Sequence, residues 1–121
     1  MNLEVGSPGT ALSQQSCRDR MARSRRGFLA CSERALPTVV PVHLRLRAGR
    51  LLVTLHDPAF RDQLVGQVVA LGIGRHDLWF RRGWRVVARG NLVPADAEDE
   101  DDVALALEPY ELEGFTFARI R

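Results

Sequence analysis

The sequence predicts a mainly β protein, in which about six mostly antiparallel strands and two or three short helices form a closed or split barrel. The chain has 121 residues, 45% of them hydrophobic and 26% charged, which is typical of an ordinary globular domain. Residues 1–11 show no periodicity and are expected to be a flexible leader, so residues 12–121 form the single predicted domain. At this length, barrel closure hides the sheet edges.

The segment Leu36–His56 is predicted to be the long β-hairpin on which the barrel is built. Apolar residues alternate on both sides of Ala48-Gly49, the expected turn. The apolar face would consist of Val40, Val42, Leu44, Leu46, Leu51, Val53 and Leu55, with Leu46 opposite Leu51, Leu44 opposite Val53, and Val42 opposite Leu55. Pro37 and Pro41 cannot donate ladder hydrogen bonds, so the first part of the hairpin should be an edge, a bulge or a ligand-facing stretch.

Two short helices are expected on either side of the hairpin. Ser13 should cap the first, which runs to about Arg23 with Cys17 and Met21 on its buried face. The second should begin with Asp57 as the N-cap and Pro58 in the first turn. Its apolar stripe would consist of Phe60, Leu64 and Val65.

The other predicted elements follow from apolar runs and their breaks. They are a strand at Gly27–Ser32, a strand at Gln67–Ile73, a charged loop at Arg75–Arg82, a strand at Trp84–Val93, a helix at Asp96–Leu107 and a closing strand at Phe115–Arg121. Gly90 indicates a bulge or bend within its strand, and Pro94 should end that strand. The acidic residues at the start of the last helix would suit the positive end of its dipole.

Composition limits the ligands and the cellular compartment. All 17 basic side chains are arginines, so an anion would be held by guanidinium groups or backbone amides. No apolar run reaches the roughly 20 residues of a membrane span, and no signal-peptide pattern is present. Cys17 and Cys31 lack a CxxC spacing. We therefore expect a reduced, cytoplasmic protein without a membrane partner.

The chemistry-bearing residues give no positive signal for several classes of site. His43, His56 and His76 are dispersed, so no metal site is predicted. There is no nucleophile elbow, dinucleotide fingerprint or Walker loop. The arginines within 18–26 and 81–85 would suit a nucleic-acid-binding barrel, but too few aromatic residues lie among them, and we expect no nucleic-acid partner.

An anion site is predicted where the hairpin meets the second helix. Thr54 ends a strand, Asp57 and Pro58 open the helix, and Arg61 lies in its first turn. A hydroxyl, a helix N-terminus and a guanidinium together favour a phosphate. The alternative is an ordinary helix cap and a surface arginine.

Several segments resemble the pyridoxamine 5'-phosphate oxidase-like family of FMN-binding split barrels. Leu36–His43, LPTVVPVH, is similar to the signature strand of that family, and Gly83–Gly90, GWRVVARG, to a later glycine-tryptophan strand. Leu12–Cys31 and Phe115–Arg121 resemble its opening and closing elements. The resemblance spans residues 12–121 and implies a split β-barrel that dimerises, with FMN in two symmetric grooves at the subunit interface.

The resemblance also implies which residues contact the cofactor ring. Pro41, Val42 and His43 would lie along the isoalloxazine, while Trp84 and Arg85 belong to the strand that approaches it from the other side. The alternatives are that Trp84 is a core or interface anchor, and that His43 is a neutral histidine opposite Thr54.

At the other end of the cofactor, the resemblance implies that Thr54 contacts the phosphate region. Arg61 stands where the family usually has a phosphate-binding lysine, which keeps the charge but changes its shape.

The function implied is an FMN-dependent oxidoreductase, a cytoplasmic homodimer acting on an unidentified small molecule. The isoalloxazine would carry the redox chemistry, so no catalytic side chain is required and none is predicted. The deazaflavin F420 could occupy the same groove, since the superfamily uses both cofactors. The alternative function is a cofactor-free split barrel that acts as a binding or sensor module.

Overall fold

The computed structural model describes residues 9–55, 57–77, 82–95 and 104–118. Within them the chain forms two helices and six strands. In order these are α1 (Gln14–Arg23), β1 (Arg26–Glu33), β2 (Leu36–Arg47), β3 (Arg50–Thr54), α2 (Pro58–Leu64), β4 (Val68–Asp77), β5 (Arg82–Pro94) and β6 (Ala104–Ala118).

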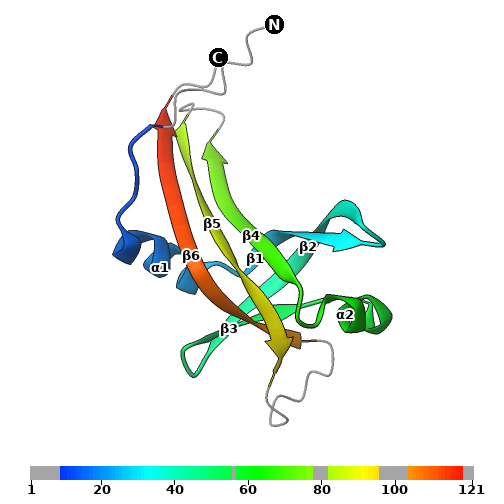
Figure 1. The fold of residues 1–121 in the computed structure, drawn as a ribbon. Coiled ribbons are helices and arrows are strands. Elements are labelled where there is room, and N and C mark those ends of the chain that lie inside the picture. Colours follow the sequence, from blue (N-terminus) through cyan, green and yellow to red (C-terminus); the bar gives the residue numbers. More distant parts are fainter. Residues whose placement is uncertain (1–8, 56, 78–81, 96–103, 119–121) are drawn as a thin grey trace, which may run out of the picture.

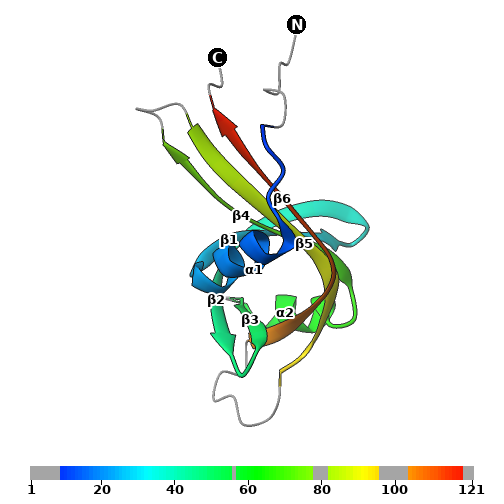
Figure 2. The ribbon, with the colours of Figure 1, turned by 90° about the vertical axis from the view of Figure 1, so that its left-hand side faces the viewer.

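The six strands close into one antiparallel barrel. Their order around it is β1-β2-β3-β6-β5-β4, and β4 pairs back onto β1 to complete the ring. Figure 1 shows β4, β5 and β6 side by side, and Figure 2 shows that they extend past the barrel toward the chain termini. The predicted mainly β architecture of six antiparallel strands is therefore confirmed.

The central hairpin has the predicted register. Leu44 pairs with Val53 and Leu46 with Leu51, which leaves His43 opposite Thr54. The turn residues Ala48 and Gly49 have φ of 50° and 77°, as a tight two-residue hairpin turn requires. Leu46 is nonetheless 49% exposed, so the apolar face continues past the region that the barrel covers.

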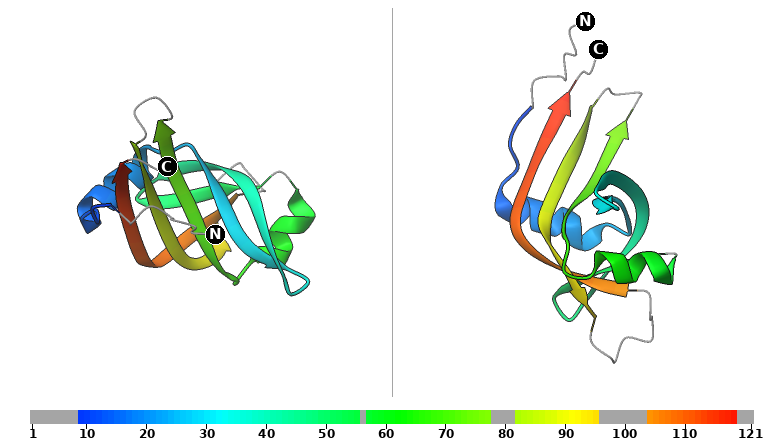
Figure 3. Two further views of the ribbon diagram at one scale, coloured as in Figure 1. Left: turned by 90° about the horizontal axis from the view of Figure 1, so that it is seen from above. Right: turned by 45° about the vertical axis from the view of Figure 1, so that its right-hand side comes forward.

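The apolar faces of the strands meet inside the barrel, and each helix closes it from a different side. The buried core cluster consists of Cys17, Met21, Leu29, Cys31, Val42, Leu44, Leu51, Val53, Leu55, Leu64, Val69, Leu71, Ile73, Val86, Ala88, Leu92, Leu105 and Leu107. The helix α1 packs on β5 and β6, while α2 packs near β1. The left panel of Figure 3 shows the two helices on opposite sides of the barrel.

Both helices begin as the sequence predicts. The Ser13 hydroxyl accepts a hydrogen bond from the backbone N–H of Ser16 at 3.1 Å. The carboxylate of Asp57 accepts one from the N–H of Ala59 at 3.0 Å. One detail was wrong, because α2 ends at Leu64 and Val65 is its 40% exposed C-cap. Val65 therefore does not belong to the buried stripe.

The predicted helix at Asp96–Leu107 was wrong where the structure describes it. Ala104–Leu107 is the first part of β6, paired with β3 on one side and with β5 on the other. All four side chains are buried. A short apolar run carries little periodicity of its own, and two flanking strands fix it as a strand. Residues 96–103 of that prediction lie outside the described residues.

The charged loop predicted at Arg75–Arg82 was also too long. Residues 75–77 continue β4, and Arg82 already begins β5, with Asp77 paired to Arg82. Residues 78–81, including Trp79 and Phe80, lie outside the described residues. The strand predicted at Phe115–Arg121 begins much earlier, at Ala104, and residues 119–121 are not described. The expected bulge is confirmed by the register shift between Arg89 and Gly90.

The first described residues run along β6. The backbone N–H of Thr116 donates to the carbonyl of Thr10 at 2.9 Å, and the N–H of Leu12 donates to the carbonyl of Gly114 at 2.8 Å. Ala11 forms a β-bridge with Phe115. The part of the predicted leader from residue 9 onward is thus held against the sheet.

Candidate functional site

A groove crosses the outer face of the sheet over β1, β2, β4 and β5. It consists of two cavities, of about 480 and 390 Å³, that share Phe28, Gly72, Ile73 and Gly74. These volumes lie in the range that binds small organic molecules. The smaller cavity is also lined by Arg26, Gly27, Pro41, Val42 and His43, and the larger one by Ala30, Val39, Ala70, Arg75, His76, Trp84, Arg85, Val87 and Phe117.

The floor of the groove is open because Gly72 has no side chain. A Cβ placed on Gly72 would have only one neighbour within 4 Å, the carbonyl oxygen of Phe28 at 3.9 Å. The neighbouring glycines are different, since a Cβ on Gly27 or Gly74 would meet a backbone oxygen at 2.9 or 2.8 Å. Gly72 is therefore the position at which the sheet leaves space for a flat ligand.

The predicted segment Pro41–His43 lies along this groove. Pro41 and His43 are exposed, while the Val42 side chain is only 3% exposed and belongs to the core cluster. Because neighbouring strand residues face opposite sides, Val42 meets the cavity with its backbone. Residues 36–42 of β2 pair with β1 only, because pairing with β3 begins at His43. Of the three alternatives predicted for the segment with Pro37 and Pro41, the structure therefore shows an edge strand.

Thr54 and Arg61 lie apart from the groove. Thr54 ends β3 opposite His43, and Arg61 lies on α2; neither residue lines either cavity of the groove. Nη1 of Arg61 is 3.2 Å from the Asp62 carboxylate, and the Arg61 side chain is 23% exposed. Its Nε is buried without a hydrogen-bond partner. An anionic oxygen would satisfy that orphaned donor.

Trp84 and Arg85 face opposite sides of β5. Trp84 packs against the core cluster and lines the larger groove cavity, and the Arg20 guanidinium carbon lies 4.7 Å from the centroid of its ring. Arg85 is exposed and pairs with Gly74. The structure thus brings Arg85 to the groove that Pro41 and His43 also line, and gives Trp84 a packing role as well.

Arg89 and the two cysteines have their polar groups paired or buried. Nη1 of Arg89 contacts Glu113 at 3.0 Å and Glu111 at 3.1 Å, and the hydrogen bond to Glu113 raises the pKa of this guanidinium. Burial raises the pKa of the Cys17 and Cys31 thiols, in Cys17 against the lowering effect of Arg20 and Arg18. Both thiols are free and buried, so neither is a reactive nucleophile.

Sequence reasoning missed the glycine at the floor of the groove and one of its apolar walls. Neither Gly72 nor Phe28 was predicted as a site residue. Phe28 is 62% exposed, although it lies in a strand. The available signal was the apolar residue at an outward position of β1, opposite a glycine in β4.

The fold is that of the pyridoxamine 5'-phosphate oxidase-like split barrels, which confirms the resemblance at the level of the fold. Three of the solved structures that share it are described here. The FAD binding protein from Mycobacterium smegmatis has a TM-score of 0.72 and 20% identity, over 89% of this chain and 97% of that one. A putative pyridoxamine 5'-phosphate oxidase from Corynebacterium glutamicum has a TM-score of 0.72 and 14% identity, over 91% and 98%. A FAD-binding protein from Mesorhizobium loti has a TM-score of 0.68 and 17% identity, over 91% and 97%.

No protein-family model matches the sequence, and no curated protein matches it either. Among the described residues, no three or more histidine, cysteine, aspartate or glutamate side chains gather as a metal site. In the same residues, neither helix is long and apolar enough to span a bilayer.

Proposed function

We propose that this protein is a flavin-binding split barrel that works as an FMN-dependent oxidoreductase on a small molecule. Residues 12–121 act as one domain, and the protein is a cytoplasmic homodimer whose cofactor sites lie at the subunit interface. No side chain is assigned a catalytic role, because the bound flavin supplies the electron transfer and the chain holds and orients it.

The observation that carries this proposal is the open floor over Gly72. Flat ring systems bind in mostly apolar clefts that place a few polar groups at the edge. Phe28 and Pro41 supply apolar walls, while His43 and Arg85 supply polar groups at the rim. Among the structures of the same fold, two are described as FAD-binding proteins and one as a putative pyridoxamine 5'-phosphate oxidase, which supports a flavin as the ring system.

The phosphate end of the cofactor is assigned to Arg61 and Thr54. The buried Nε of Arg61 is a donor without an acceptor, and a phosphate oxygen is the acceptor that suits it best. Thr54 adds a hydroxyl at the end of β3, beside His43 in the ladder. Arginine in place of a lysine keeps the charge and offers a planar fork of donors.

A second copy of the chain completes the site. Phe28, Val39 and Val68 are 62%, 65% and 61% exposed on the outer face of β1, β2 and β4. A large apolar patch of this kind is typical of a protein interface. Its position around the groove supports a homodimer in which both copies contribute to each site.

Titration with three cofactors tests the proposal. Purified protein, stripped of any bound cofactor, is mixed with FMN, FAD or deazaflavin F420, and binding is followed by absorbance and fluorescence. We expect FMN to bind with the highest affinity, at one molecule per chain. Preferential binding of F420 would assign the deazaflavin, and not FMN, as the cofactor. If none of the three binds, the proposal fails and the cofactor-free binding module replaces it.

A valine at position 72 tests the groove itself. Gly72→Val fills the floor with a branched side chain, so we expect FMN affinity to fall by about tenfold or more. The fold should tolerate this change, because a Cβ at Gly72 meets nothing closer than 3.9 Å. The matched control is Ser32→Val on β1, an exposed position outside both cavities of the groove. Equal affinity in both variants would exclude the groove as the flavin site.

A further inference from the structure

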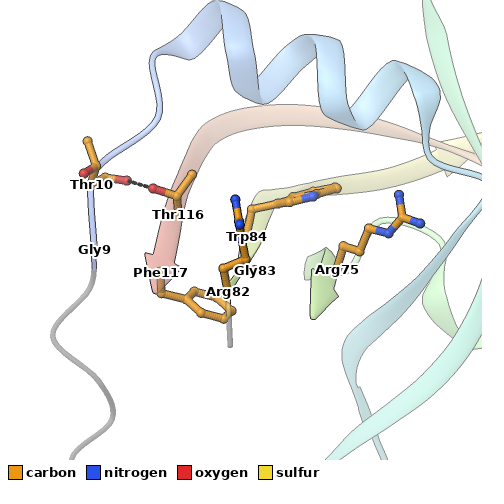
Figure 4. A pocket seen from close by; sticks show the side chains of 8 residues that line it. All are labelled: Gly9, Thr10, Arg75, Arg82, Gly83, Trp84, Thr116 and Phe117. Atoms are coloured by element: carbon orange, nitrogen blue, oxygen red, sulfur yellow. Dashed lines mark hydrogen bonds between the residues drawn. The ribbon is translucent and has the colours of Figure 1, made fainter. Parts of the chain in front are cut away.

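A cavity of about 570 Å³ runs under α1, on the side of β4 and β5 that the helix covers. Serine, glutamine and arginine side chains of α1 and its two ends line one side of it, and Arg75 of β4 and Trp84 of β5 line the other. Figure 4 shows α1 passing along one side of the Trp84 indole, with the Arg75 guanidinium beyond the end of the indole. The rim of this cavity therefore combines residues of one helix with residues of two strands.

Four arginines gather around this cavity. Three of them line it, two from the last turn of α1 and one from β4. The fourth, Arg25, continues the ladder of β1 and alternates in step with the buried Leu29, so it lies on the face turned toward the core and α1. Together they form the α1 arginine surface, which consists of Arg20, Arg23, Arg25 and Arg75.

The charges of this surface are not neutralised by the part of the chain that the structure describes. Arg20 and Arg23 donate to neutral oxygens, a serine hydroxyl at 3.4 Å and a backbone carbonyl at 3.3 Å. The side chains of Arg25 and Arg75 are exposed and form no hydrogen bond or ion pair with any described residue. Such guanidinium groups are available to the carboxylates of another molecule.

The folding of the chain does not account for this concentration of charge. A helix dipole favours cations in the last turn, which explains Arg20 and Arg23. Arg25 and Arg75 lie outside the helix, so the dipole does not explain them. Asp19 is the only acidic residue among the described residues that line the cavity. Clustered charges of one sign repel one another, and an acidic partner relieves that repulsion.

The composition of the surface favours an acidic protein over a nucleic acid. Its arginines come from α1, from the residue before β1 and from β4, and a protein surface with several carboxylates can pair with all of them at once. Among the described residues that line the cavity, Trp84 is the one aromatic side chain, and the Arg20 guanidinium carbon covers its ring at 4.7 Å from the centroid. Single-stranded nucleic acids need exposed aromatic rings on which their bases stack.

Trp84 connects the α1 arginine surface to the proposed flavin groove. Its side chain lines the cavity under α1 and also the larger cavity of the groove. Electron transfer between proteins slows steeply with distance, so a protein that reduces a flavin must dock close to it. A protein docked on this surface is separated from the groove by a single indole.

We propose that the α1 arginine surface docks an acidic one-electron carrier protein, and that this carrier reduces the proposed flavin. Two reduced carriers each give one electron, the flavin takes up both electrons together with two protons from solvent, and two oxidised carriers dissociate. Electron-transfer partners bind through small, weak interfaces that complementary charges orient. The role of the carrier as reductant rests on the proposed function, whereas the docking of an acidic protein does not.

Surface plasmon resonance with the full chain, free of flavin, tests the docking. The probes are a plant-type ferredoxin, which is an acidic iron–sulfur carrier, cytochrome c, which is a basic carrier, and a short single-stranded DNA. We expect ferredoxin to bind at least about tenfold more tightly than either other probe. Its affinity should fall when salt is raised from about 0.01 to about 0.1 M, because the charges are screened. Any other order of affinities would overturn the proposal, and tightest binding of the DNA would assign the surface to a nucleic acid.

Two variants with the same net charge locate the docking site. Arg23→Gln removes one charge from the α1 arginine surface and should weaken ferredoxin binding by about threefold or more. The matched control is Arg34→Gln, at an exposed arginine in the β1–β2 turn, which lies on the side of the barrel away from α1 (Figure 1). Equal losses in the two variants would show general attraction and overturn the assigned surface.

Reduction of the bound flavin gives the second measurement. Reduced ferredoxin is mixed with the FMN-loaded protein, and the loss of flavin absorbance is followed by stopped flow. The rate at a limiting ferredoxin concentration should fall in Arg23→Gln and stay unchanged in Arg34→Gln. Docking without reduction of the bound flavin would refute the role as reductant. Flavin binding without docking would refute the docking surface alone, and docking to a chain that binds no flavin would refute the proposed cofactor.

Discussion

The guanidinium of Arg61 is only partly stabilised by its own chain. Its ion pair is with Asp62, a carboxylate that is 76% exposed, and such exposed pairs contribute little free energy. Its Nε is buried without an acceptor, and leaving a buried donor unpaired costs about 1–3 kcal/mol at full burial. A residue in this state is better suited to binding an anion than to stabilising the fold.

Replacement of Arg61 measures that role. Arg61→Ala should weaken FMN binding by about tenfold or more, because a charge-assisted contact to the phosphate is lost. The measurement is the Kd from quenching of FMN fluorescence. Arg61→Met, which keeps the apolar stem and removes the orphaned donor, should lower the affinity similarly without lowering the thermal unfolding midpoint. Unchanged affinity in both variants would remove Arg61 from the site.

Single residues of the site were predictable only where the alternation of apolar residues along a strand fixes the face on which each side chain lies. The hairpin register placed His43 opposite Thr54 and turned Val42 inward, and the structure has both. The role of Gly72 could not be predicted, because one glycine in a strand indicates a bend, a bulge or a close approach of another backbone equally well. The position of Arg75 on a strand was not predicted, because the charged residues between positions 75 and 82 favoured a loop over a strand.

At the scale of elements, the sequence predicted correctly those features that depend only on residues close together in the chain. The caps at Ser13 and Asp57 and the turn at Ala48-Gly49 depend on neighbouring residues, and each was correctly predicted. The segment Ala104–Leu107 is a strand because β3 and β5 pair with it from both sides. These partner strands lie far away in the sequence, so no local pattern predicts the pairing.

The bulge in β5 gives an element-scale prediction. A Cβ on Gly90 would lie 2.1 Å from the carbonyl oxygen of Glu108 on β6, so the two strands must separate to accept it. We expect Gly90→Ala to destabilise the protein by about 1–3 kcal/mol. Gly72→Ala is the matched control, with an expected change within about 0.5 kcal/mol, since its Cβ has open space. Urea unfolding curves measure both, and equal midpoints for the two variants would contradict this account of the bulge.

At the scale of the whole molecule, apolar residues gather both inside the barrel and on one part of its outer face. Its interior is a continuous apolar core, whereas the outer face of β1, β2 and β4 carries Phe28, Val39 and Val68 into solvent. The barrel already has a core of its own, so these exposed residues are not needed to fold it. Apolar side chains around a groove are explained by an interface that covers them.

Loss of that interface should also remove the cofactor. The native protein should have twice the 13.5 kDa mass of one chain by light scattering. Val68→Glu places a charge on the outer face at a position that lines neither cavity of the groove, so it should give monomers without altering the groove. FMN affinity should then fall together with dimer content, because each proposed site takes residues from both copies. Val65→Glu, the same change at the exposed end of α2, should leave both quantities unchanged. A monomeric native protein that still binds FMN would contradict the shared site and leave each groove complete within one chain.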